Sequence, residues 1–202
     1  MSPVRVNYWA EGPTDRFVAR RIIAAAGGEP GDDYSARLRA APGKDYLDAQ
    51  LARFNAAARH APWLVLRDGD GDCAVAVVTR LLPGPADYMR LRIINPAVEA
   101  WLMADREAFA GFLGVSVARV TADPESVIDV KREVVAIASH SRSRAIRDAL
   151  CPDPRSGRRV GPEYATYLIE FVQNHWTVER ARVGSQSLDR ALRRVTELTN
   201  SA

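Results

Sequence analysis

Cysteine and lysine are scarce in this chain. Of its 202 residues only Cys73 and Cys151 are cysteines, and no cluster of His or Cys accompanies either of them. A disulfide framework and a zinc site are therefore not expected, and both thiols are predicted to be reduced. The only lysines are Lys44 and Lys131, so almost every positive charge belongs to an arginine, whose planar guanidinium makes bidentate contacts to phosphate.

Long apolar runs are missing as well. The chain begins with MSPVRVNYW, which contains no apolar leader, and no run approaches the roughly 20 residues of a membrane span. The one Gly-Lys pair is followed by Asp45, where a phosphate-binding P-loop requires Ser or Thr. We therefore expect a cytoplasmic protein with no membrane contact and no nucleotide-binding loop of its own, and the sequence is compatible with a homo-oligomer.

What the chain does contain is an alternation of strand and helix patterns supported by 47% hydrophobic residues. Residues 4–9 mix β-branched and aromatic types and predict a strand that stops before Glu11. The continuous apolar run 63–66 predicts a buried parallel strand that ends at Asp68. Further elements are expected as helices over residues 13–26, 45–60 and 74–82 and as strands over residues 34–39 and 89–94.

Beyond residue 95 the periodicity is helical only. Helices are predicted over residues 97–104, 106–113, 127–138, 143–150, 163–174 and 185–198. The pattern as a whole predicts an α/β fold, a Rossmann-like core with a mainly parallel sheet of about four strands flanked by helices. We expect that core to occupy residues 1–105 and a helical C-terminal portion, residues 106–202, to pack on it.

Acidic residues follow two of the predicted strands. Glu11 comes after the first strand, and three more acids alternate with glycines after the buried one: Asp68, Asp70 and Asp72. Because the carboxyl ends of parallel strands meet at one edge of a sheet, these acids are expected to converge there. Carboxylates about 4–6 Å apart repel one another by roughly 1–4 kcal/mol per pair, which a bound cation relieves. An all-oxygen set favours Mg²⁺ or Mn²⁺.

Glu99 stands just after the predicted strand over residues 89–94, so it is a further candidate ligand of the same cation. The alternative is that it only favours the start of a helix through the helix dipole. Trp101, two residues on, is expected to be a core residue rather than a stacking platform.

The Asp-rich segment is also compatible with a plain acidic turn. An EF-hand loop counted from Asp68 would need Gly and Glu where Cys73 and Thr79 stand, which excludes it. The segment WLVLRDGDGD is similar to the haloacid-dehalogenase-like phosphatases, whose nucleophile would correspond to Asp68, but their motif usually lies on the first strand. A phosphatase or phosphotransferase acting on a small substrate therefore stays as an alternative.

Basic residues are concentrated in the C-terminal part of the chain. Residues 1–130 carry 15 Lys or Arg against 17 Asp or Glu, whereas residues 131–202 carry 13 against 8. A basic surface of this kind is typical of phosphate contacts, although a solvated charged linker is an equal alternative. The candidates for substrate binding are Lys131, Arg132, Arg142 and Arg144, with His140 as a proton carrier.

The motifs AEGPTDRF (residues 10–17) and VLRDGDGD (residues 65–72) resemble the Toprim domain, including the nuclease domains of the overcoming-lysogenization-defect family. Together with NPAVEAWLMAD (residues 95–105), they are closest to a Toprim-like bacterial family of unknown function. The resemblance implies that Glu11 is a general acid/base or metal ligand and that Asp68 and Asp70 bind Mg²⁺.

It further implies a hydrolase that cuts DNA or RNA phosphodiesters, in phage defence or DNA repair, beside an ABC-type ATPase partner. A non-catalytic regulatory subunit of such an ATPase complex is another alternative.

Overall fold

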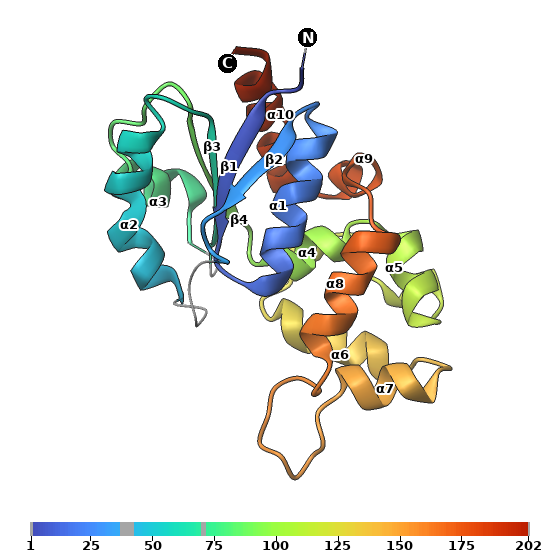
Figure 1. Cartoon of the computed structure of the whole chain (residues 1–202). Helices are drawn as coiled ribbons and strands as arrows, with labels where there is room; N and C mark the ends of the chain where they lie inside the picture. Colours follow the sequence, from blue (N-terminus) through green and yellow to red (C-terminus); the bar gives the residue numbers. More distant parts are fainter. Residues whose placement is uncertain (1, 37–42, 70–71, 202) are drawn as a thin grey trace.

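The computed structural model describes residues 2–36, 43–69 and 72–201, and in them the chain forms a parallel four-stranded sheet flanked by helices. The strands are β1 (Arg5–Ala10), β2 (Glu29–Asp33), β3 (Trp63–Asp68) and β4 (Met89–Ile94), in the spatial order β2-β1-β3-β4. Every neighbouring pair is parallel. The α/β class, the parallel sheet and the helical C-terminal part are therefore as the sequence predicts (Figure 1).

One strand was predicted in the wrong place. The sequence pattern favours residues 34–39, but β2 is formed by the segment EPGDD at Glu29–Asp33. Residues 34–36 form bends and a turn, and residues 37–39 lie outside the described part of the chain. Pro30 is tolerated because β2 is an edge strand, where a missing backbone donor costs little. Pairing with β1 sets the position of this strand: the amide of Glu29 donates a hydrogen bond to the carbonyl of Val4 at 2.8 Å.

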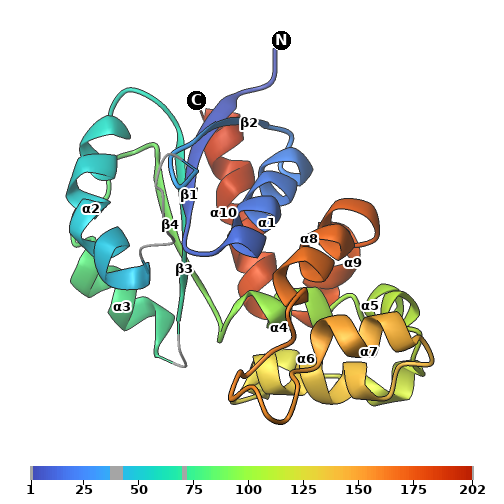
Figure 2. The same cartoon turned by 60° about the horizontal axis from the view of Figure 1, so that its bottom comes forward.

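Helices cover both faces of the sheet (Figure 2). On one face lie α2 (Gly43–Ala57) and α3 (Ala74–Leu81), packed over an apolar cluster that includes Trp63, Val65 and Leu91. On the other lie α1 (Pro13–Ala25) and α10 (Gln186–Ser201), packed over the alternate strand residues. Side chains of a strand alternate between faces, so a sheet covered on both sides needs near-continuous apolar strands such as WLVL in β3.

The helical portion forms one apolar core with the second face. Its helices are α4 (Val98–Met103), α5 (Arg106–Leu113), α6 (Val130–Ser139), α7 (Arg144–Leu150), α8 (Tyr164–Asn174) and the short α9 (Val178–Ala181). Trp101 is fully buried, as expected, and its indole nitrogen donates to Ser187 Oγ at 2.6 Å. Among the described residues no helix combines the length and the apolar character needed to cross a membrane.

One helix start in this portion differs from the sequence pattern. The helix predicted from residue 127 begins at Val130, because the carboxylate of Asp129 accepts a hydrogen bond from the amide of Arg132 at 3.1 Å and caps it. The last helix leaves the other helices and returns to the sheet beside α1 and β4. The second layer of the sheet is therefore completed by the C-terminal end of the chain.

Candidate functional site

The carboxyl ends of three parallel strands meet at one edge of the sheet, and acidic side chains gather there. Glu11 follows β1 directly, Asp68 is the last residue of β3, and Glu99 lies in the first turn of α4, which follows β4. All three line one cavity of about 300 Å³. The structure therefore places these three sequence-predicted candidates around a single space.

A fourth acid, Asp15, lines the same cavity, and its sequence context pointed to no role there. It stands at the third position of α1 and is 5% exposed, and its carboxylate accepts a hydrogen bond from the amide of Gly12 at 2.8 Å. This interaction ties the tight turn after β1 to the start of α1. In the sequence, Asp15 is an acid in the first turn of a helix. Helix capping is enough to explain such a residue, so the sequence offered no reason to place it in the cavity.

Asp68 owes its position to the glycine after it. The amide of Gly69 donates to the carbonyl of Ile94 at 2.8 Å, so the loop leaves β3 across the end of β4. A Cβ at position 69 would lie 2.8 Å from that same carbonyl oxygen, closer than side-chain carbons come to backbone. Only glycine lets the chain approach β4 this closely.

Glu99 is held from the helical portion of the molecule. It is 3% exposed, and the hydroxyl of Tyr164, at the start of α8, donates to its Oε1 at 3.3 Å. Tyr164 was not predicted, because it is 65 residues from Glu99 and the segment VGPEYATYLIEFV around it indicates only a packed helix. Within the described residues, Glu99 Oε2 and Asp68 Oδ1 are buried and have no hydrogen-bond partner.

Burial and mutual repulsion dominate the electrostatics of the cavity. Burial, followed by the charges of Asp15, Glu99 and Glu11, raises the pKa of Asp68 to about 9. The pKa of Asp15 is raised to about 6, mainly by burial and further by the charges of Glu99 and Glu11, whereas the hydrogen bond from the Gly12 amide lowers it. Burial raises the pKa of Glu99 also. The ammonium of Lys131 opposes all three pKa shifts, so it is a cation that faces this acidic cluster.

The donor chemistry of the cavity fits a hard divalent cation. Its candidate ligands are carboxylate oxygens, two of which are buried without a hydrogen-bond partner in the described residues. In the same part of the chain no group of three or more His, Cys, Asp or Glu side chains is placed so that it could hold a metal ion. Asp70 lies outside the described residues. Asp72 is exposed and lines a different hollow, so the structure does not bring it to this cavity.

The predicted phosphate-binding residues are spread along α6 and α7. Lys131 lines the cavity at the start of α6, and Arg132 is exposed beside it. His140 lies at the other end of α6, about 13 Å away at 1.5 Å per helical residue, with Nδ1 2.9 Å from the carbonyl of Ala136.

The two arginines that follow lie near that same far end of α6. Arg142 lies near the carbonyl of Gly114, with its Nε 3.4 Å from that oxygen, and Arg144 forms an exposed pair with Asp148 at 3.3 Å. Of the predicted set, Lys131 is the one that lines the acidic cavity.

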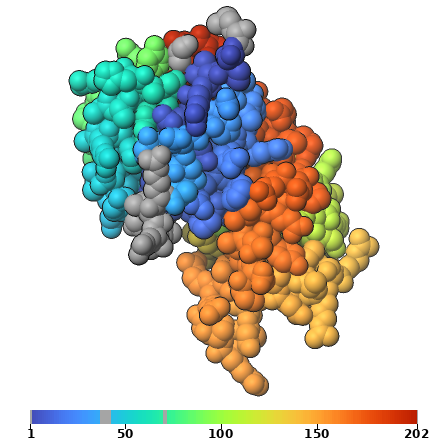
Figure 3. All heavy atoms as spheres, viewed as in Figure 1, coloured from blue at the N-terminus to red at the C-terminus, as the bar shows by residue number. Residues whose placement is uncertain are grey.

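The loop between α7 and α8 carries three more arginines, Arg155, Arg158 and Arg159. It projects from the body of the protein in the space-filling view, below the helical portion (Figure 3). Arg159 pairs with Asp129 at 2.7 Å, which ties the end of this loop to the start of α6. Val160 then lines the acidic cavity, so the projecting loop returns to the protein at the rim of this cavity.

No protein-family model, curated protein or solved structure matches this chain. Its likeness to the Toprim domain therefore stays a prediction based on the motifs at residues 10–17 and 65–72.

Proposed function

We propose that this protein is a Mg²⁺- or Mn²⁺-dependent nuclease that hydrolyses nucleic-acid phosphodiester bonds. The observation that carries the proposal is that the carboxylates of Asp68 and Glu99 face one cavity, each with a buried oxygen that has no hydrogen-bond partner in the described residues. They come from separate strand ends, the place where open parallel sheets bind ligands. A buried ionised carboxylate needs a cation or a hydrogen-bond donor, and two of them around one cavity favour a divalent ion.

Each residue of the cavity has a role in this proposal. Asp68, Glu11 and Glu99 would hold the cation, which when bound supplies charge stabilisation to the phosphoryl oxygens. The Tyr164 hydroxyl orients Glu99. Lys131 contributes a positive charge beside the cavity for the substrate phosphate, and Glu11, only half-buried at the turn after β1, is placed to exchange a proton with an attacking water or a leaving oxygen.

The proposal also includes a biological setting. A role in phage defence or DNA repair beside an ATPase rests on the Toprim resemblance. The chain has no Gly-Lys-Ser or Gly-Lys-Thr loop, so ATP hydrolysis of the P-loop type would come from a partner protein.

The test is cleavage of supercoiled plasmid, single-stranded DNA and tRNA by the purified chain, with Mg²⁺ or Mn²⁺ and with EDTA. Glu11→Gln and Asp68→Asn are expected to abolish cleavage while keeping the fold. Asp87→Asn is the matched control, because Asp87 is exposed and lines neither this cavity nor the hollow that contains Asp72. Full cleavage by both cavity variants would overturn the proposal.

The same proteins separate this function from its rivals. A phosphatase using Asp68 as nucleophile would hydrolyse p-nitrophenyl phosphate, would be trapped by a fluoride phosphate mimic and would tolerate Glu11→Gln. A regulatory subunit would bind Mg²⁺, measured as a rise in melting temperature, yet would cut nothing until an ATPase is added. Either pattern contradicts an autonomous nuclease.

A further inference from the structure

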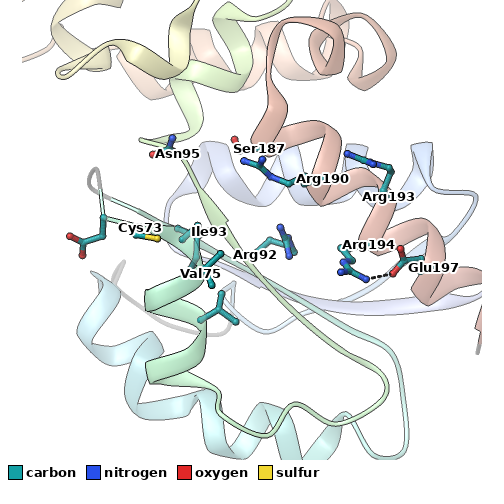
Figure 4. Close-up of a pocket in the computed structure, with 13 residues that line it drawn as sticks. Cys73, Val75, Arg92, Ile93, Asn95, Ser187, Arg190, Arg193, Arg194 and Glu197 are labelled. Carbon is teal, nitrogen blue, oxygen red and sulfur yellow. Dashed lines mark hydrogen bonds and ion pairs between the residues drawn. The ribbon is translucent and has the colours of Figure 1, made fainter.

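A second and larger hollow, of about 840 Å³, is lined in part by Asp72 and Cys73, which follow β3 in the sequence. It is bounded by the start of α3, by the edge strand β4 and by α10 (Figure 4). Four arginines line it, against two carboxylates, Asp72 and Glu197: they are Arg92, Arg190, Arg193 and Arg194. We call this hollow the arginine groove.

The helical side of the groove follows from the sequence of α10. One face of α10 carries the charged residues of the groove. Counted from Arg190, they follow at three, four and seven residues, which is the spacing of a single helical face: Arg193, Arg194 and Glu197. The opposite face, which includes Leu188, is buried in the core. An amphipathic helix packed by its apolar side must present its arginines outward, and here they face the sheet edge.

Arg92 supplies the other side of the groove. Its neighbours on β4, Leu91 and Ile93, pack under α2 and α3, so the alternation of the strand turns Arg92 toward α10. Figure 4 shows its guanidinium reaching toward the helix between Arg190 and Arg194. Its Nε is buried and has no hydrogen-bond partner in the described residues.

The positive charges of the groove are only partly neutralised. Arg194 pairs with Glu197 at 2.8 Å, and Arg193 pairs with Asp189 at 2.8 Å. Within the described chain, neither Arg92 nor Arg190 has a carboxylate within ion-pair distance. Burial, together with the charges of Arg194, Arg190 and Arg90, lowers the pKa of Arg92. An anion with several oxygens would relieve this repulsion and satisfy the guanidinium donors.

We propose that the arginine groove binds the sugar-phosphate backbone of a nucleic-acid strand, with Arg92 and Arg190 as its phosphate contacts. The inference rests on the proposed nuclease function for the identity of the anion. The two sites are close in the sequence, because Asp68 lines the acidic cavity while Asp72 and Cys73 line the groove. A strand held in the groove is therefore expected to lie near the carboxylates.

The lining also defines the kind of recognition. No aromatic side chain is among the described residues that line the groove, so bases have no stacking platform there. Guanidinium contacts to phosphate carry no base information. Binding through the groove is therefore independent of sequence and strongly dependent on salt.

The test is fluorescence anisotropy of the full chain with labelled single-stranded and duplex oligonucleotides of mixed sequence, in EDTA so that no cleavage occurs. Arg190→Glu is expected to weaken binding about tenfold at low salt and to lower the slope of log affinity against log salt by about 0.7 to 0.9 for the lost contact. Arg53→Glu is the matched control, since Arg53 is exposed on α2 at the other face of the sheet. Equal affinities for Arg190→Glu and the wild type would overturn the proposal.

A second variant and a competitor distinguish a nucleic-acid strand from an acidic protein as the occupant of the groove. Arg92→Lys keeps the charge but loses the bidentate geometry, so it is expected to weaken binding while the melting temperature stays near that of the wild type. Poly-glutamate and unlabelled DNA are compared as competitors at equal concentrations of negative charge. If poly-glutamate displaces the oligonucleotide equally well, the groove is assigned to an acidic protein and the proposal is overturned. Groove-dependent binding without any metal-dependent cleavage would refute the nuclease function and leave the groove intact. Metal-dependent cleavage that is unaffected by the groove variants would support the nuclease function and refute the role of the groove.

Discussion

Replacing Asp68 by asparagine is expected to make the metal-free protein more stable at neutral and alkaline pH. The folded protein keeps a proton on Asp68 up to about pH 9, whereas a solvated aspartate releases it near its ordinary pKa of 3.8. Between these values the folded state binds one proton more than the unfolded state, so the free energy of unfolding falls as pH rises. Asp68 thus disfavours folding increasingly above pH 3.8, and the loss levels off only above pH 9.

The magnitude follows from linkage. One extra bound proton lowers the free energy of unfolding by about 1.4 kcal/mol per pH unit, or roughly 3 kcal/mol between pH 6 and pH 8. Asp15, whose pKa is raised to about 6, contributes mainly below this window. The raised pKa of Glu99 adds a change of the same sign. Asp68→Asn removes the contribution of Asp68 to the pH dependence of the free energy of unfolding, because asparagine does not titrate.

The assay is urea unfolding at pH 6, 7 and 8 in EDTA, for the wild type, for Asp68→Asn and for the exposed control Asp72→Asn. The wild type and the control are expected to lose stability over this range, and Asp68→Asn is expected to lose less, by about 1.4 kcal/mol per pH unit. Saturating Mg²⁺ is expected to flatten the wild-type dependence by favouring the ionised carboxylates. Identical slopes for wild type and Asp68→Asn would refute the reasoning.

Two further predictions concern the fold around the site. Gly69→Ala places a Cβ 2.8 Å from a carbonyl of β4 and is expected to cost about 1–3 kcal/mol in urea unfolding, whereas Gly84→Ala, with no atom within 4 Å, should cost far less. Arg180→Ala removes the partner of Asp105, whose side chain is 2% exposed, and is expected to cost about 1–3 kcal/mol. Arg144→Ala breaks an exposed ion pair with Asp148 and should change the melting temperature by little, and equal losses of stability in the two variants would contradict the role of burial.

Three of the four strands could be located from sequence because their apolar runs are unambiguous. The fourth could not, since EPGDD has no strand propensity and is recruited only by hydrogen bonding to β1. The same contrast separates the helices: α5 begins and ends where its periodicity does, whereas the start of α6 depends on the Asp129 cap. The local sequence pattern was sufficient to locate an element where its apolar spacing and its intrinsic secondary-structure propensity indicate the same structure.

The acidic cavity was partly predictable for a topological reason. Parallel strands bring their carboxyl ends to one edge, so acids placed after several strands must approach one another whatever the details of packing. Glu11, Asp68 and Glu99 were found in this way. Asp15 was hidden by its capping role, and Tyr164 reaches Glu99 from a helix whose docking no local pattern encodes.

The amino-acid sequence by itself determined the alternation of strands and helices, the strand-end acids and an arginine-rich C-terminal part, because each follows from short-range spacing along the chain. Tertiary structure alone decided which charges meet. It returned α10 to the sheet edge, so that Arg190 lies opposite Arg92, while it left Arg142 and Arg144 on the far end of the helical portion. That outcome depends on how apolar faces from distant segments pack, and packing is a property of the whole core.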